Sequence, residues 1–151
     1  MLRFLNTLWA FARPHTIIGT TLSVLSLYLL AAIDAGHWPM AQALLAALVA
    51  TWGGNVYIVG LNQIIDLDLD RINKPHLPLP SGRLSLTGAA VVTTIAGAIG
   101  LIVSSLGSGY LFLVLVISMI LGTAYSLPPI RLKRFPFWST FCILAVRGVV
   151  V

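Results

Sequence analysis

Residues 41–70 read AQALLAALVATWGGNVYIVGLNQIIDLDLD, an apolar run that ends in three aspartates. The stretch 41–65 contains no charged side chain, and about 20 mostly apolar residues are enough for a helix to cross a bilayer. This stretch therefore predicts a transmembrane helix with a cluster of carboxylates at its end. The cluster is Asp66, Asp68 and Asp70, and the only other acidic residue of the chain is Asp34.

The composition of the whole chain agrees with a membrane protein. Of its 151 residues 58% are hydrophobic and 9% are charged, and the mean hydropathy is +0.98. Soluble domains carry about a quarter charged residues, so a water-soluble enzyme and a disordered tail are disfavoured. The net charge is +5, but the nine Lys and Arg residues are scattered and make no basic stripe. The composition therefore predicts no nucleic-acid partner; the expected surrounding is the lipid bilayer, and protein partners stay unknown.

The same reading along the chain predicts an all-α fold, a multi-span transmembrane helical bundle with four full spans and the start of a fifth. Residues 1–13 predict a short interfacial helix, because Phe4, Leu8 and Trp9 fall on one face. A secretory signal peptide is the rival interpretation, which the long apolar run and the lack of a clean cleavage site disfavour. The predicted spans are residues 16–35, 41–65, 84–106, 110–127 and 138–151, the last of them incomplete.

The positive charges predict the orientation of these spans. Eight of the nine Lys and Arg residues precede the first span or follow the second and fourth, and the turns after the first and third spans have none. Because cytoplasmic loops carry an excess of Lys and Arg, the N-terminus and the aspartate cluster are predicted to be cytoplasmic.

The spacing of the polar residues in the cluster is compatible with a metal site. If the helix continues through the aspartates, Asn62, Asp66 and Asp70 are four residues apart and share one face. Amide and carboxylate oxygens suit Mg²⁺, which would also relieve repulsion between two carboxylates at a negative helix end. The alternative is a solvated charged loop, neutralised by neighbouring cations such as Arg71 and Lys74. Spacing alone leaves both interpretations open.

Several segments resemble the UbiA superfamily of intramembrane aromatic prenyltransferases. Residues 62–70 (NQIIDLDLD) and 73–82 (NKPHLPLPSG) are similar to the first aspartate-rich motif of that superfamily. Residues 13–20 (RPHTIIGT) and 125–134 (YSLPPIRLKR) are similar to two further family segments. The motif NKPHLPL (residues 73–79), together with residues 146–148 (VRG), most resembles the homogentisate prenyltransferases. The resemblance runs across essentially the whole chain.

The resemblance implies a reaction and a set of site residues. Mg²⁺ held by Asn62, Asp66 and Asp70 would neutralise charge on a prenyl diphosphate, with Asp66 and Asp70 as the catalytic carboxylates. The prenyl group, for which phytyl is the expected tail, would then alkylate homogentisate, which loses its carboxylate as CO₂. Tocopherol-type prenylquinone synthesis in a cyanobacterial inner or thylakoid membrane, or in a plastid membrane, is the expected setting.

The substrate-binding candidates are basic or hydroxyl side chains that match family segments or flank the metal face. Arg13, Arg71 and Lys74 would serve equally well as anchors at the membrane surface. The full set of candidates is Arg13, Arg71, Lys74, Tyr125, Lys133, Arg134 and Arg147.

Arg147 differs from the others in its depth. It follows Trp138 by nine residues, roughly 13 Å along a helix, and a cation at that depth usually faces a cavity or a partner. If Arg147 belongs to the active site, it would bind the carboxylate of the aromatic acid or the diphosphate. A packing role is the alternative.

The resemblance also implies a second aspartate-rich motif, which these residues lack, since no acidic residue follows Asp70. Relatives of this kind have about twice this length, so residues 1–151 are expected to be the N-terminal half of such a domain and inactive or nearly so alone. A small oligomeric transporter or channel subunit is the alternative from another class, and an inactive membrane scaffold is a third.

Overall fold

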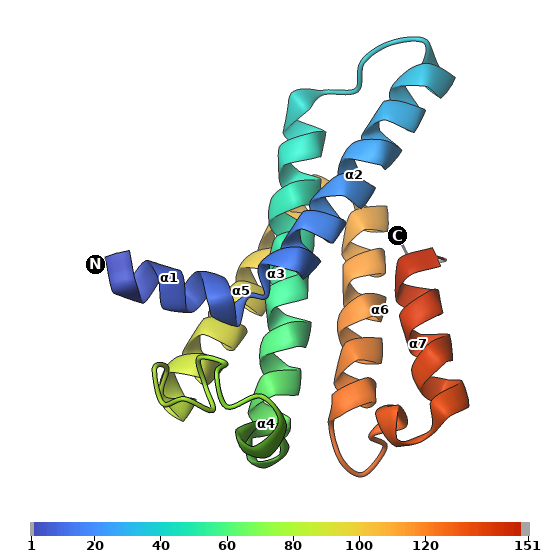
Figure 1. Cartoon of the computed structure of the whole chain (residues 1–151). Coiled ribbons are helices and arrows are strands. Elements are labelled where there is room, and N and C mark those ends of the chain that lie inside the picture. Colours follow the sequence, from blue (N-terminus) through green and yellow to red (C-terminus); the bar gives the residue numbers. More distant parts are fainter. Residues whose placement is uncertain (1, 149–151) are drawn as a thin grey trace.

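Figure 1 shows that the regular elements of residues 2–148 are all helices, joined by turns and loops, with the long helices running roughly side by side. The computed structural model describes the backbone of residues 2–148 and the side chains of residues 2–144. The helices are α1 (Leu2–Phe11), α2 (Pro14–Ala35), α3 (Ala41–Ile65), α4 (Leu67–Asn73), α5 (Leu86–Gly107), α6 (Gly109–Ser126), the short 3₁₀ helix η1 (Leu132–Arg134) and α7 (Pro136–Gly148).

Four of these helices, α2, α3, α5 and α6, are long and apolar enough to cross a membrane. The all-α bundle with four spans is therefore confirmed. Helix α7 lies in the predicted fifth segment, and residues 149–151 of that segment lie outside the described part of the chain. Many outward apolar side chains are exposed, for example Ile33 and Leu106, as expected of surfaces that meet lipid. Which side of the membrane each end occupies stays a prediction.

The ends of the helices follow local chemistry and so differ by one or two residues from some predicted ends. Ser85 and Ser108 each accept a hydrogen bond from a backbone N–H three residues ahead, and thereby cap α5 and α6. Helix α6 stops before Leu127, which has an extended backbone because Pro128 follows it. Helices α2 and α7 both begin at a proline, the residue that best suits the first turn.

Helix α3 lies at the centre of the bundle, with α5 packed directly against it (Figure 1). The two backbones approach closely at Gly53 and Gly100. A Cβ at Gly53 would lie 2.5 Å from the carbonyl oxygen of Ala96, and one at Gly100 would lie 2.9 Å from the carbonyl oxygen of Ala50. Glycine at both positions is therefore what allows α3 and α5 to touch.

The loop after α4 is held against α1. Phe11, at the end of α1, is fully buried among Leu79, Leu84 and Ala89. Gln63 of α3 is also buried, and its side-chain amide donates a 2.8 Å hydrogen bond to the carbonyl oxygen of Phe11. The outer residues of α1, including Phe4 and Trp9, stay exposed. The elbow between α1 and α2 is thereby fixed beside the aspartate segment.

Candidate active site

Asp66 lies at the junction of α3 and α4, where the helix is interrupted. The helix therefore does not run unbroken through the aspartates, as the shared-face prediction required. The helical hydrogen bonds nevertheless continue across the junction: the N–H of Asp66 donates to the Asn62 carbonyl at 3.0 Å, and that of Asp70 to the Asp66 carbonyl at 2.7 Å. The side chain of Asp66 points toward the segment that follows α6, as its contacts show.

Two cations from the segment after α6 bind the carboxylate of Asp66. The Nη2 of Arg131 donates to Oδ1 of Asp66 at 3.0 Å, and the Nζ of Lys133 donates to Oδ2 at 2.5 Å. The Asp66 side chain is 12% exposed, that of Lys133 15% and that of Arg131 23%. Because these charges are largely withdrawn from water, removing one partner would leave an uncompensated charge and cost several kcal/mol (about 3–5).

Asn62 adds a neutral oxygen to the same group. Its Oδ1 accepts a 2.9 Å hydrogen bond from the Nζ of Lys133 and a 3.2 Å bond from the hydroxyl of Ser126, which is fully buried. The Lys133 ammonium therefore sits between one amide oxygen and one carboxylate oxygen. We call Asn62, Asp66, Arg131 and Lys133 the Asp66 cluster.

The Asp66 cluster carries two cations on one carboxylate and so has a net positive charge. The Nε of Arg131 is buried and has no hydrogen-bond partner among the described residues. Arg131 also has a left-handed backbone, with φ of 39°. This conformation costs a non-glycine residue about 1–2 kcal/mol, and such strain gathers at functional sites. The cluster is thus a place where a further anionic group has a donor available.

The other two aspartates bind different cations. The carboxylate of Asp70 is buried and lies 3.3 Å from the Nζ of Lys74. Asp68 is exposed and pairs with Arg71 at 3.0 Å on the surface. Within the described residues, no three His, Cys, Asp or Glu side chains form a group that could hold a metal ion. The structure therefore brings Asn62 and Asp66 together through Lys133, and Asp70 has its own partner.

The remaining predicted residues fall in three places. Tyr125 is partly buried on α6, directly before Ser126 of the site, and Arg134 is exposed on η1. Arg13 and Lys74 line a pocket beside α1 instead of the Asp66 cluster. The side chain of Arg147 lies outside the described residues.

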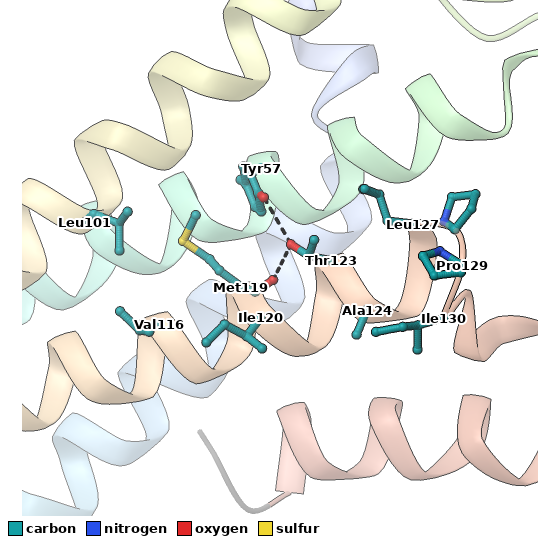
Figure 2. Close-up of a pocket in the computed structure, with 11 residues that line it drawn as sticks. Tyr57, Leu101, Val116, Met119, Ile120, Thr123, Ala124, Leu127, Pro129 and Ile130 are labelled. Atoms are coloured by element: carbon teal, nitrogen blue, oxygen red, sulfur yellow. Dashed lines mark hydrogen bonds between the residues drawn. The ribbon is translucent and has the colours of Figure 1, made fainter.

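An apolar cavity of about 480 Å³ lies between α3, α5 and α6, and it extends to the turn that precedes Arg131. Figure 2 shows Met119, Ile120 and Thr123 projecting from α6 along this cavity, with Tyr57 opposite. The Tyr57 hydroxyl and the Thr123 hydroxyl are hydrogen-bonded at 3.0 Å, so the main polar groups of this wall satisfy each other. The space suits a hydrocarbon ligand of moderate size.

Two residues of the site, Arg131 and Ser126, were not singled out by the sequence. Both lie inside the quoted segment 125–134, which pointed to Lys133 and Arg134 instead. Proximity to Asp66 is a matter of the fold, because the pair Arg131 and Asp66 is 65 residues apart in sequence. The presence of two prolines just before Arg131 is the signal that could have marked it, since they end α6 and turn the chain.

The chain is similar to several curated proteins. Homogentisate phytyltransferase of Synechocystis sp. (strain ATCC 27184 / PCC 6803 / Kazusa) is 47% identical over 97% of this chain and 49% of its own length. The chloroplastic homogentisate phytyltransferase 1 of Arabidopsis thaliana is 44% identical over 97% of this chain and 39% of its own. The chloroplastic homogentisate solanesyltransferase of Arabidopsis thaliana is 40% identical with the same two coverages, 97% and 39%. The chain spans about half or less of the length of these curated relatives.

A solved structure has the same fold. It comes from work on the digeranylgeranylglyceryl phosphate synthase in membranes, and it superposes on 99% of this chain and 51% of its own with a TM-score of 0.87 and 25% sequence identity. Residues 21–151 also match the UbiA prenyltransferase family as a whole. This match covers most of the chain, including the aspartate segment and the turn that carries Arg131 and Lys133. The chain therefore belongs to the UbiA prenyltransferase family, a family of membrane transferases.

Proposed function

We propose that this chain takes part in the transfer of a prenyl group, with phytyl as the preferred tail, from a prenyl diphosphate to homogentisate in the presence of Mg²⁺. The observation that carries the proposal is the Asp66 cluster, in which two cations bind one carboxylate at a helix end and an amide oxygen accepts a hydrogen bond from one of these cations. The 47% identity to a homogentisate phytyltransferase supports the choice of acceptor. A homogentisate solanesyltransferase is also 40% identical, and the test therefore compares both tails.

The oxygens of Asn62 and Asp66 are of the type that a divalent cation takes, and they would be free for it once Lys133 turns toward the diphosphate. The Lys133 ammonium already occupies a cation position between the oxygens of Asn62 and Asp66, and hard oxygens are the ligands that Mg²⁺ prefers. Asn62 and Asp66 would hold the ion, with Asp70 from the next turn as the further carboxylate. When bound, Mg²⁺ supplies charge neutralisation to the diphosphate leaving group.

The protein residues have separate tasks in this reaction. Arg131 and Lys133 bind diphosphate oxygens, and the unpaired Nε of Arg131 is one of the donors. Tyr125 and Arg134 lie next to these groups in sequence and bind the same anion or the acceptor. Arg71 stays a candidate to bind the diphosphate leaving group from the side of α4. Arg147 stays a candidate to bind the carboxylate of the acceptor.

The bond changes follow from the leaving group. The allylic carbon–oxygen bond breaks, with its electron pair leaving on the diphosphate, and a carbon–carbon bond forms with the ring of homogentisate. The ring releases a proton, the carboxylate leaves as CO₂, and the carbon that bore it takes up a proton. The apolar cavity of Figure 2 would hold the prenyl tail and keep water from the reacting carbon.

The residues whose side chains are described do not favour the transporter or channel alternative; Arg147, whose depth would fit it, lies outside them. The ionisable groups of a transporter would sit near the middle of the membrane, but Asp66 lies at the end of α3. The relatives are cyanobacterial and chloroplastic, and a membrane of that kind is the proposed location.

The direct test is prenyl transfer in membranes that contain the chain, on its own and extended to the length of its relatives. Homogentisate is supplied with phytyl diphosphate or solanesyl diphosphate, with and without Mg²⁺, and the prenylated product is measured by mass. We expect Mg²⁺-dependent product from the extended chain, with more from phytyl diphosphate. The absence of any Mg²⁺-dependent product with homogentisate contradicts the proposal.

A further inference from the structure

A second basic site lies on the side of α1. Arg13, His15 and Lys74, together with Trp9, line a pocket of about 420 Å³ between the elbow of α1 and α2 and the loop after α4. Arg13 makes no ion pair within the described residues. Lys74 shares its charge with Asp70 at 3.3 Å, and its side chain is still 49% exposed. The pocket therefore carries more positive than negative charge and is open to an anion.

An apolar pocket adjoins the basic one and shares Trp9 with it. This second pocket, of about 460 Å³, is bounded by α2 and α3 and includes Ile18, Leu22 and Trp52. Ile18 and Leu22 are 55% and 60% exposed, which places this surface at the lipid-facing side of the bundle. The Nε1 of Trp52 is hydrogen-bonded to the Thr21 hydroxyl, so the indole is held in place along the groove.

The two pockets together have the profile of a phospholipid: a cationic end at the predicted cytoplasmic surface and an apolar groove that runs into the membrane. Trp9 lies where they meet, at the position that tryptophan prefers between water and lipid. We propose that this site, Trp9, Arg13, His15 and Lys74 with the groove below them, binds one anionic phospholipid, with the phosphate on Arg13 and Lys74 and an acyl chain along α2 and α3.

The backbone of Arg13 supports a binding role for its side chain. Arg13 has a left-handed conformation with φ of 53°, which glycine or asparagine would adopt with less strain. The chain instead keeps a cation there, directly at the pocket. The site shares no residue with the Asp66 cluster, so this inference does not rest on the proposed transfer reaction.

The test measures which lipid stays with the protein. The full chain is extracted from vesicles of equal parts dioleoyl phosphatidylglycerol and dioleoyl phosphatidylcholine, and bound lipid is counted by native mass spectrometry. We expect one retained phosphatidylglycerol per chain. Arg13→Asn suits the left-handed backbone and removes the charge, so it should lower the retention of phosphatidylglycerol by about fivefold.

Arg83→Gln is the control, because Arg83 is an exposed cation in the loop after α4 and lines neither of the two pockets. It should leave retention unchanged. Equal retention of the two lipids, or equal retention by wild type and Arg13→Asn, overturns the proposal. If Arg13→Asn does not fold, as judged by its circular dichroism, Trp9→Ala decides in the same way, because Trp9 is exposed and lines both pockets.

A further arm separates a lipid from a free phosphate anion. Inorganic diphosphate is added to the wild-type protein before extraction. Undisturbed retention of phosphatidylglycerol supports the lipid site, whereas its complete release by diphosphate would assign the pocket to a soluble phosphate compound and overturn the proposal.

Discussion

Lys133 is the residue whose position would differ between the metal-free site and the metal-bound site. Its ammonium bridges Asn62 and Asp66, the oxygens proposed to hold Mg²⁺. A metal ion and this ammonium would compete for the same two oxygens. The lysine would therefore have to turn toward the diphosphate when the metal binds. Substitution of Lys133 should thus change the affinity for the metal ion and the affinity for diphosphate in opposite directions.

Lys133→Gln is expected to raise the affinity for the divalent ion by about tenfold in the absence of diphosphate, because it removes a charged hydrogen-bond donor from the ligand oxygens. The same change should weaken the binding of diphosphate. Mn²⁺, used in place of Mg²⁺, allows the bound ion to be counted by electron paramagnetic resonance. Arg83→Gln, which removes an exposed charge from the loop after α4, is the control. An unchanged or lower Mn²⁺ affinity for Lys133→Gln would argue against shared oxygens.

At this scale the sequence identified the carboxylates better than their partners. The spacing of Asn62 and Asp66 selects them because one helical turn separates them. Arg131 could not be chosen in this way, since its contact with Asp66 depends on how α6 ends and where the following turn leads. The pairing of Asp70 with Lys74, by contrast, is readable from the sequence, because the two residues are four apart and such pairs meet on a helix.

At the scale of elements, the contact between α3 and α5 fixes the position of α3, which carries Asn62 and ends at Asp66. Gly53→Ala is expected to destabilise the bundle by about 1–3 kcal/mol, because the new Cβ would meet the carbonyl oxygen of Ala96 at 2.5 Å and the Cα of Gly100 at 2.9 Å. Unfolding in mixed detergent micelles measures this change.

Gly19→Ala is the matched control for that substitution. Gly19 lies within α2, and nothing lies within 4 Å of a Cβ built on it. Because alanine favours a helix over glycine by about 0.5–1 kcal/mol, this variant should be as stable as the wild type or more stable. Equal destabilisation by both alanines would mean that close approach of α3 and α5 is not what Gly53 provides.

The helices themselves were largely predictable, and α1 shows why part of their packing was not. Long apolar runs between turn residues define α2, α3, α5 and α6, so their existence follows from length and hydropathy. Helix α1 was expected to lie at the membrane surface, with Phe4, Leu8 and Trp9 on its apolar face, and this expectation named no contact with the rest of the protein. In the structure Phe4 and Trp9 are exposed and Phe11 is buried under the loop 74–85, a contact that depends on a segment far away in sequence.

For the whole molecule, the orientation across the membrane is the property on which the site depends, because a diphosphate must reach the Asp66 cluster from the aqueous side. The distribution of Lys and Arg predicts that the loop 74–85 is cytoplasmic and that the turn 36–40 lies on the opposite side.

Single cysteines test this orientation in a background in which the buried Cys142 is replaced by serine. His37 and Ser81 are both exposed and lie in the two loops. In intact bacterial cells, a membrane-impermeant maleimide should label His37→Cys, and it should label Ser81→Cys only after the membrane is opened. The reverse pattern would place the Asp66 cluster on the wrong side for a cytoplasmic diphosphate.

The most direct test of the account as a whole compares two neutral substitutions in one short segment. Asp66 is 12% exposed and binds Arg131 and Lys133, whereas Asp68 is 94% exposed and pairs only with Arg71. In the chain extended to the length of its relatives, Mg²⁺-dependent prenyl transfer to homogentisate is measured for Asp66→Asn and Asp68→Asn, with folding checked by thermal unfolding. Asp66→Asn should lower the rate about 100-fold or more, and Asp68→Asn should leave it within about twofold. Equal losses in the two variants, or normal transfer by a folded Asp66→Asn protein, would contradict the assignment of the Asp66 cluster as the diphosphate site.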